Sequence, residues 1–356
     1  MRNFLMLALG LMLTGSAFAQ DAPKIRVYGY LETYYGFDFN KPADNNRPGF
    51  VYSHNRHNEV NLNLGFIKVA YDDGIVRSNL ALMTGTYTNA NLAAEPGVLK
   101  NIFEANAGLK LSKTANLWID AGIFASHIGF ESAISKDCWV LTRNIASDNT
   151  PYYESGAKIT YGTAENKFTI SGIYLNGWQR ITRLNGNSQP AGALQLTFKP
   201  TNKITINYSN YLGTEGEDAV RVRRFYNNFY GIFQLTDQFG LIAGFDYGTQ
   251  QIANGSDDTN EVIAPVLIAQ IKLYPKLTVA GRIEYYQDKN SVFIPTESPE
   301  GFKTSGYSLN LDYTPVSNAV IRLEGKIFDS KGKIFIREAS PVNQNAAVTT
   351  SVAISF

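Results

Sequence analysis

The feature that most constrains the fold of this chain is a series of segments in which apolar and polar residues alternate. In residues 306–313, for example, Tyr307, Leu309 and Leu311 alternate with Ser308 and Asn310. A period of two places successive side chains on opposite faces of a β-strand. About sixteen such segments follow one another, and the connections between them are short and long in strict turn. An even number of antiparallel strands with both termini on the short-turn side is typical of a transmembrane β-barrel.

A soluble β-sandwich also contains alternating strands, but it has no reason to sort its connections into two alternating length classes. Inside a bilayer, an open sheet edge leaves unpaired backbone groups that cost several kcal/mol each, so the sheet has to close on itself. The sequence therefore predicts an all-β fold, an antiparallel up-and-down transmembrane barrel. The predicted strands are residues 25–39, 59–71, 75–87, 102–111, 117–124, 153–161, 168–178, 192–198, 204–212, 224–235, 239–247, 262–273, 277–286, 306–313, 321–327 and 348–356.

The N-terminus has the features of a secretory signal. Arg2 precedes an apolar run over residues 4–13, and Ala17-Phe18-Ala19 has the small-x-small form of a cleavage site. The apolar run is too short to span a bilayer as a helix. We expect a cleaved signal peptide at residues 1–19 and a single barrel domain at residues 20–356.

Charge and cysteine content exclude several classes of protein. Without Arg2, 31 basic residues balance 31 acidic residues, so the composition does not favour a nucleic-acid partner. The single cysteine, Cys138, can form neither an internal disulfide nor a thiolate metal site, and we expect it to be a buried structural residue. The 21 Tyr and 21 Phe residues suit a barrel with aromatic girdles at the two membrane interfaces.

Motifs of enzymes and cofactor sites are missing from the sequence. There are three histidines, His54, His57 and His127, and no HExxH, GxSxG, P-loop or CxxC motif. His54 and His57 could form a metal cluster with Glu59, but an Asn- and Arg-rich loop over residues 40–58 favours a solvated surface position. We therefore expect no catalytic residues, no metal and no cofactor.

Charged residues on the polar faces of the strands are expected to line the lumen. Sixteen strands enclose more space than side chains can fill, so water should fill the rest. The predicted lumen-lining residues are Glu104, Lys110, Glu154, Lys158, Arg282, Glu284, Arg322, Glu324 and Lys326. The last five of these residues could form a charged ladder that screens solutes, or they could pair with one another as part of the barrel wall.

Residues 126–151 form an unusually long connection after the fifth strand. A loop of this length inside a compact domain is commonly functional or disordered, and its Trp, Phe and Ile residues argue against disorder. We expect it to fold inward and narrow the lumen, although a loop that covers the barrel mouth would fit the same pattern. The candidate constriction residues are His127, Glu131, Lys136, Asp137, Arg143 and Asp148.

Three stretches resemble a known family. HIGFES at residues 127–132, TPYYESG at 150–156 and GYLETYYGFDFN at 29–40 are similar to the β-barrel porin-2 (OmpL-like) proteins, which are common in the outer membranes of Bacteroidota. The resemblance covers essentially the whole mature chain. It implies a porin-like channel in the outer membrane of a Gram-negative bacterium, and it brings no catalytic residue and no substrate. The terminal Phe356 is similar to the closing aromatic residue of other outer-membrane barrels.

The expected function is passive diffusion of small hydrophilic solutes or ions, with outer-membrane lipid as the surroundings. The resemblance to porins also leaves a homotrimer open. One alternative is a non-conducting adhesion or anchoring barrel that uses the loops at residues 40–58 and 288–302. A barrel hydrolase is a third alternative, for which the sequence offers no Ser/His or Asp/His pair.

Overall fold

A computed structural model describes residues 24–356 of the chain, so the expected signal peptide lies outside the described residues. The strands form one closed barrel in which each strand pairs antiparallel with its neighbours and β18 pairs with β1. This confirms the predicted sixteen-stranded barrel. The barrel strands are β1 (Ile25–Asp38), β2 (Val60–Asp72), β3 (Val76–Thr84), β4 (Ile102–Lys110), β5 (Asn116–Ala125), β6 (Tyr153–Gly162), β7 (Phe168–Leu175), β8 (Ala191–Thr201), β9 (Ile204–Glu215), β10 (Val222–Gln234), β11 (Phe239–Gln251), β12 (Thr259–Tyr274), β13 (Leu277–Asp288), β14 (Phe302–Val316), β15 (Ala319–Ser330) and β18 (Gln344–Ser355).

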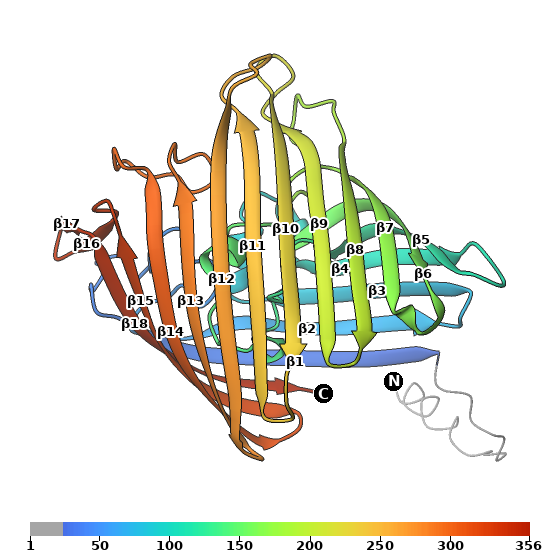
Figure 1. The fold of residues 1–356 in the computed structure, drawn as a ribbon, viewed down its shortest axis with the longest axis horizontal. Coiled ribbons are helices and arrows are strands. Elements are labelled where there is room, and N and C mark those ends of the chain that lie inside the picture. The colour runs from blue at the N-terminus through green and yellow to red at the C-terminus, as the bar shows by residue number, and fades with distance from the viewer. Residues whose placement is uncertain (1–23) are drawn as a thin grey trace, which may run out of the picture.

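Short turns gather at one end of the barrel and longer loops at the other. Figure 1 shows this for β8 to β14, with the short turns at the lower end and the longer loops at the upper end. We refer to these ends as the short-turn side and the long-loop side. The long loops contain α1 (Thr86–Asn91), η1 (Gly97–Asn101), η2 (Ser135–Asp137), α2 (Ile145–Asp148) and a small hairpin of β16 (Phe335–Arg337) and β17 (Ser340–Val342), and one short turn contains η3 (Ala164–Asn166).

The barrel closes between its first and last strands. The backbone N–H of Gly29 donates to the carbonyl of Phe356 at 2.7 Å, and the N–H of Phe356 donates back to Gly29 at 3.0 Å. The Phe356 ring packs over Gly29 and occupies the place where a Cβ on residue 29 would be. The last residue of the chain therefore completes the sheet.

Two strands end earlier in the structure than the sequence pattern predicts. The strand predicted at residues 75–87 ends at Thr84, and residues 86–91 form α1 instead. Gly85 takes a φ of 130°, and a Cβ there would meet the carbonyl of Asn63, so the chain turns away from the sheet at this glycine. The strand predicted at residues 168–178 ends at Leu175, shortly before Gly177, which has a φ of 147°.

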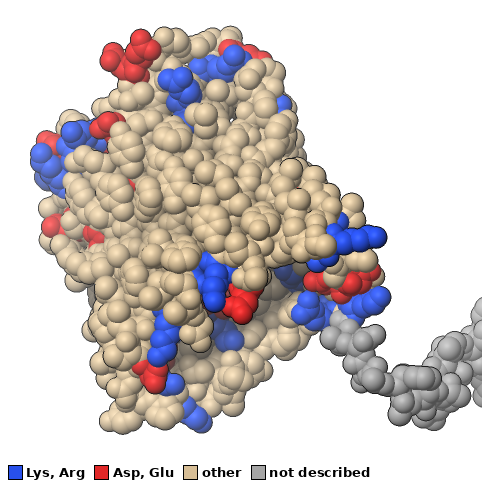
Figure 2. Space-filling model, turned by 45° about the vertical axis from the view of Figure 1, so that its right-hand side comes forward, with Lys and Arg blue, Asp and Glu red and all other residues tan. Residues whose placement is uncertain are grey.

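The outer wall of the barrel is apolar. Large hydrophobic side chains are exposed on its strands, with Leu309 67% exposed and Leu80 54% exposed. Figure 2 shows a broad uncharged surface on the face in view, with charged side chains mostly toward its margins. An apolar surface of this extent is typical of a barrel whose outer wall contacts lipid. Among residues 24–356, no helix has the length and apolar character needed to cross a membrane.

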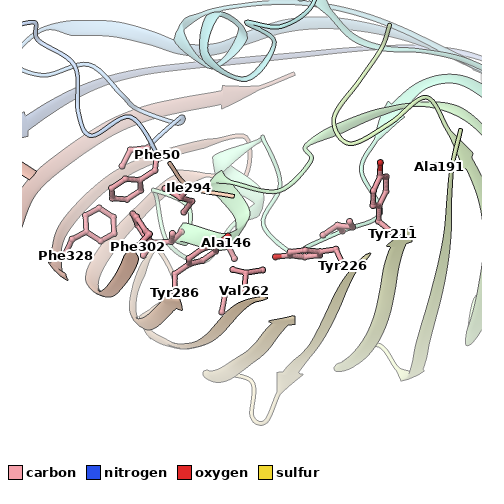
Figure 3. Close-up of a cluster of buried hydrophobic side chains, with 14 of the residues drawn as sticks. Phe50, Ala146, Ala191, Tyr211, Tyr226, Val262, Tyr286, Ile294, Phe302 and Phe328 are labelled. Carbon is pink, nitrogen blue, oxygen red and sulfur yellow. The ribbon is translucent and has the colours of Figure 1, made fainter. Parts of the chain in front are cut away.

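The largest of three clusters of buried hydrophobic residues within residues 24–356 lies inside the barrel, on the long-loop side. A cluster of buried residues joins Phe50 and Ile294 of two loops to inward-facing rings on β9, β10, β13, β14 and β15. Figure 3 shows Phe302 and Phe328 gathered around Phe50, with Tyr286, Tyr226 and Tyr211 following along the inner wall. The interior is thus filled partly by side chains and loops, and not by water alone as the strand number suggested.

Candidate functional site

Residues 126–152, which we call the lumen segment, connect β5 to β6 and contact inward-facing residues around the barrel. Val140, Leu141 and Arg143 are fully buried, and η2 and α2 lie within the segment. Its hydrogen bonds reach β1, β9, β10, β13, β14 and β15. Contacts with strands on both sides of the barrel require the segment to lie in the lumen.

Glu324 on β15 anchors the lumen segment through two hydrogen bonds. Its carboxylate accepts hydrogen bonds from the backbone N–H of Thr142 at 2.6 Å and from the Thr142 hydroxyl at 2.8 Å. Arg282 on β13 donates to the Thr142 carbonyl at 2.7 Å and lies 3.3 Å from Glu324. One residue of the segment is thereby held by both partners of a buried ion pair.

Two further cations on β15 bind backbone carbonyls of the segment. Arg322 donates to the carbonyls of Ser135 at 2.5 Å and Cys138 at 2.9 Å, and it forms a two-pronged ion pair with Asp312 on β14. Lys326 donates to the Arg143 carbonyl at 2.7 Å. Hydrogen bonds with a charged partner contribute more than neutral ones, so this wall holds the segment in one position.

The lumen segment also forms hydrogen bonds with β1 and β18, the two strands between which the barrel closes. Ser135 donates to the Glu32 carboxylate on β1, and Lys136 donates to the Ser355 hydroxyl on β18 at 3.0 Å. On another side, the backbone N–H of Gly129 donates to Asn228 on β10 at 3.1 Å.

His127 connects the start of the segment to two strands. Its Nδ1 lies 2.9 Å from the Glu154 carboxylate on β6, and its Nε2 lies 2.7 Å from the Asn210 carbonyl on β9. Both ring nitrogens therefore face acceptors, which favours the doubly protonated ring. Burial lowers the pKa of His127, but the Glu154 carboxylate and the two hydrogen bonds outweigh burial and raise it above its usual value.

Inside the segment, buried polar groups satisfy one another. Arg143 donates to the carbonyls of Ser132 at 2.6 Å, Leu141 at 2.7 Å and Ala133 at 3.1 Å. Glu131 accepts from the backbone N–H of Asn144 at 2.6 Å. These bonds give donors to three carbonyls and one carboxylate that the segment buries, which stabilises its fold away from water.

Two carboxyls of the segment have raised pKa values. Burial raises the pKa of Glu131 although Arg282 opposes it, and burial raises the pKa of Asp148 although Lys326 opposes it. Asp148 accepts a hydrogen bond from the Ser53 hydroxyl at 3.1 Å, which joins the lumen segment to the loop at residues 40–58.

The six candidate constriction residues do not form one group. His127, Glu131, Arg143 and Asp148 are buried within the segment or against the wall, whereas Asp137 is exposed and Lys136 is partly exposed. Only Lys136 and Asp137 line a cavity together, on the short-turn side. Glu131 lines a second cavity and Asp148 a third, so the candidate residues are distributed along the segment and do not gather at one constriction.

The nine predicted lumen-lining residues all face inward but divide into two sets. Arg282, Glu284, Arg322, Glu324 and Lys326 are buried beneath the lumen segment. Arg282 lies 3.4 Å from Glu284, and Lys326 lies 3.3 Å from Glu284, so four of the five pair with one another as well as with the segment, whereas Arg322 pairs with Asp312. Glu104, Lys110 and Lys158 stay partly exposed, while Glu154 is buried against His127.

The histidines of the first long loop are not on the surface. His54 is fully buried with its Nε2 3.2 Å from the Glu32 carboxylate, and His57 accepts a hydrogen bond from the backbone N–H of Asp38 at 2.8 Å. Glu59 pairs instead with Arg56 at 2.7 Å. The solvated position expected for His54 and His57 is wrong, because the loop turns inward and packs on the lumen segment. Among residues 24–356, no group of three His, Cys, Asp or Glu side chains is arranged to hold a metal ion.

The wall formed by β2 to β6 carries ion pairs that the sequence analysis did not single out. Lys68 lies 2.6 Å from Glu104, and Arg77 lies 2.5 Å from Asp120. Arg77 and Asp120 lie on the polar faces of their strands, and that position could have indicated them, whereas Lys68 shares its face with Leu64 and Phe66 and had no such signal. Glu32, by contrast, lies in an aromatic-rich strand, where nothing in the sequence separates an anchor for Ser135 from an ordinary wall residue.

Comparison with known families and structures agrees with this geometry. Residues 24–356 match the family model described as "Putative beta-barrel porin-2, OmpL-like". No curated protein sequence matches the chain.

Similar solved structures are outer-membrane barrels. They include OmpT of Vibrio cholerae (TM-score 0.58, 11% identity, 93% of this chain and 97% of that chain) and an anion-selective porin from Comamonas acidovorans (TM-score 0.60, 9% identity, 93% and 99%). The outer membrane channel DcaP of Acinetobacter baumannii is also similar (TM-score 0.57, 12% identity, 93% and 97%). At these identities the likeness concerns the fold.

Proposed function

The chain belongs to the β-barrel porin-2, OmpL-like, family, and from this membership and the geometry of its lumen we propose that it is a channel for passive diffusion of small hydrophilic solutes or ions across the outer membrane. The observation that carries the proposal is the contrast between the two faces of the wall. Leu80 and Leu82 on β3 are more than half exposed on the outside, while Arg77 on the same strand faces inward and stays partly exposed. A charged side chain that is exposed inside such a barrel avoids a large desolvation penalty only if the lumen holds water.

We further propose that the lumen segment narrows this passage. The anchors from Arg282, Arg322, Glu324 and Lys326 support this role, because they hold the segment against the β13–β15 side and leave the β2–β6 side as the less crowded part of the lumen. A segment fixed by charged hydrogen bonds acts as a permanent filter and not as a mobile lid.

Conductance in planar lipid bilayers tests both proposals. Purified protein should give stable, discrete conductance steps. Deletion of residues 136–148 should raise the single-channel conductance, because it removes the anchored half of the segment. A matched control deletes residues 253–258 of the exposed β11–β12 loop, which should leave conductance unchanged. A silent bilayer with correctly folded protein would contradict the channel, and unchanged conductance after the 136–148 deletion would contradict the constriction.

The adhesion alternative has less support. It would use the loops at residues 40–58 and 288–302 for a partner, yet Ser53 and His54 of the first loop are fully buried. Assembly into a homotrimer remains part of the proposal, supported by the fold likeness to OmpT of Vibrio cholerae in its trimer form (TM-score 0.57, 11% identity, 94% of this chain and 100% of that chain). Cross-linking in detergent with mass measurement would test it.

A further inference from the structure

We infer that the passage beside the lumen segment favours small anions, such as carboxylates and phosphate, over cations of the same size. This inference rests on the proposed channel function. It is carried by three features of the lumen: a series of cavities along one side of the segment, the unequal exposure of the paired charges there, and the cations that have no acidic partner.

Three cavities follow one another along the β2–β6 side of the lumen segment. A polar cavity of about 230 Å³ on the long-loop side is lined by Arg180, Gln179 and Tyr153. Tyr153 also lines the next cavity, of about 240 Å³, together with Glu104. Glu104 in turn pairs with Lys68, which lines a third cavity of about 490 Å³ on the short-turn side. The shared Tyr153 and the Lys68–Glu104 ion pair place these cavities in sequence from one end of the lumen toward the other.

Within the ion pairs of this wall, the cation is the more exposed partner. The Arg77 side chain is 32% exposed, whereas that of its partner Asp120 is 6% exposed. Lys68 is 23% exposed and its partner Glu104 is 16% exposed. A solute that moves past these pairs meets the guanidinium and ammonium groups more readily than the carboxylates. Water-filled passages lined by Arg and Lys are typical of anion pores.

Two further cations on this side of the lumen lack an acidic partner: Arg180 lines the long-loop cavity, and Lys158 lies on the inward face of β6 outside the three cavities. Within residues 24–356, Lys158 and Arg180 form no ion pair closer than 4.0 Å and no side-chain hydrogen bond. The Lys158 ammonium instead lies 4.8 Å from the centre of the Phe124 ring. Nearby acids are already engaged, since Asp120 pairs with Arg77 and Glu154 pairs with His127.

The short-turn cavity adds two cations and one acid. Arg26 and Lys136 line it with Asp137, and Lys136 bonds only to the neutral hydroxyl of Ser355. Two acids that line these cavities lack an ion-pair partner within the described chain: Asp137, which is exposed, and Asp148 of the long-loop cavity, which is buried. The unpaired cations Arg180, Lys158, Arg26 and Lys136 outnumber these two acids. The acids of the middle cavity, Glu104 and Glu131, are paired with Lys68 and Arg282, so the unpaired charge along the route is mainly positive and attracts anions.

The test is the reversal potential of the full-length mature protein in a planar bilayer under a tenfold KCl gradient. We expect a potential of the sign that chloride permeation produces, and a preference for chloride that strengthens as the salt concentration falls. The double variant Lys158→Gln and Arg180→Gln should lower the chloride-to-potassium permeability ratio by about twofold or more. Inorganic phosphate added to one side should reduce the chloride current in the wild type more than in the double variant.

Lys113→Gln is the control, because it removes a positive charge from an exposed short turn and not from the inner wall of the barrel. Its permeability ratio should equal that of the wild type. A wild-type preference for potassium, or a ratio that the double variant leaves unchanged, would overturn the inference while the channel function stands. A protein that folds but does not conduct would refute the channel function itself.

Discussion

The substitution Glu324→Gln isolates the contribution of one carboxylate to holding the lumen segment. Glutamine keeps the size of the side chain and one acceptor oxygen but removes the negative charge. In the native protein this carboxylate accepts two hydrogen bonds from Thr142 and faces Arg282 at 3.3 Å. The backbone ladders of β15 with β14 and β18 do not involve the side chain, so the barrel wall should stay intact.

The size of the effect follows from the contacts. A hydrogen bond to a charged group contributes roughly 1.5–3 kcal/mol, and removing one partner of a buried ion pair costs roughly 3–5 kcal/mol. Because glutamine still accepts one bond, and Arg282 keeps Glu131 and Glu284 nearby, we expect a loss of about 2–4 kcal/mol in the free energy of local opening. With a tenfold change for every 1.4 kcal/mol, residues 139–146 should open about 30- to 1,000-fold more often.

Amide hydrogen exchange of the protein in detergent measures this opening directly. Amides of residues 139–146 should exchange faster in Glu324→Gln, while amides in β10 and β11 should be unchanged. Glu261→Gln provides the matched control, because Glu261 accepts a bond from Tyr247 at an exposed site far from the segment. Equal protection of residues 139–146 in Glu324→Gln and in the wild type would refute the view that charged anchors fix the segment.

Three further predictions concern single residues. Gly156→Ala should press its Cβ against the backbone carbonyl of Tyr174 and weaken the pairing of β6 with β7 by about 1–3 kcal/mol, seen as a lower temperature for the heat-induced mobility shift in electrophoresis, whereas Gly172→Ala, which has open space for its Cβ, should leave that temperature unchanged. The Cys138 thiol should resist maleimide at pH 8 in the folded barrel and react after unfolding, because burial raises its pKa to about 11; rapid labelling of the folded protein would contradict this. Burial lowers the pKa of His127, but the Glu154 carboxylate outweighs burial and raises it. Protonated His127 therefore stabilises the fold fully below its unfolded pKa of about 6.5, and this stabilisation is lost as the pH rises through the folded pKa. Exchange of the amides that follow His127, corrected for the intrinsic rate, should therefore increase above that pH, and His127→Gln should abolish the dependence.

The strands were predictable because a strand with one face toward lipid and one toward the lumen alternates apolar and polar residues with a period of two. In β14 and β15, where outward Leu309 and Leu323 alternate with inward Asn310 and Glu324, the pattern gives both the strand and its orientation. Strand ends that are set by backbone geometry were harder to predict. Gly85 ends β3 through its positive φ, but the apolar and polar pattern continues past it into α1.

The interior contacts could not be predicted, since they join residues far apart in the chain. Thr142 and Glu324 are 182 positions apart, and each alone is an ordinary polar residue. The burial of His54 depends in the same way on Glu32 across the inward turn of the loop at residues 40–58. The polar face of a strand indicates which side chains point inward, but it does not indicate which of them are covered by a loop and which contact water.

The orientation of the wall is the claim on which the remaining conclusions depend, and neighbouring residues of β3 test it most directly. Spin labels at position 79 or position 80, in protein reconstituted into lipid vesicles with Cys138 replaced by Ala, report the surroundings of each face. We predict that a label replacing Leu80 is relaxed by a lipid-soluble reagent and that a label replacing Asn79 is relaxed by a water-soluble one. Equal access of the water-soluble reagent to both positions would contradict a barrel with lipid outside and water within.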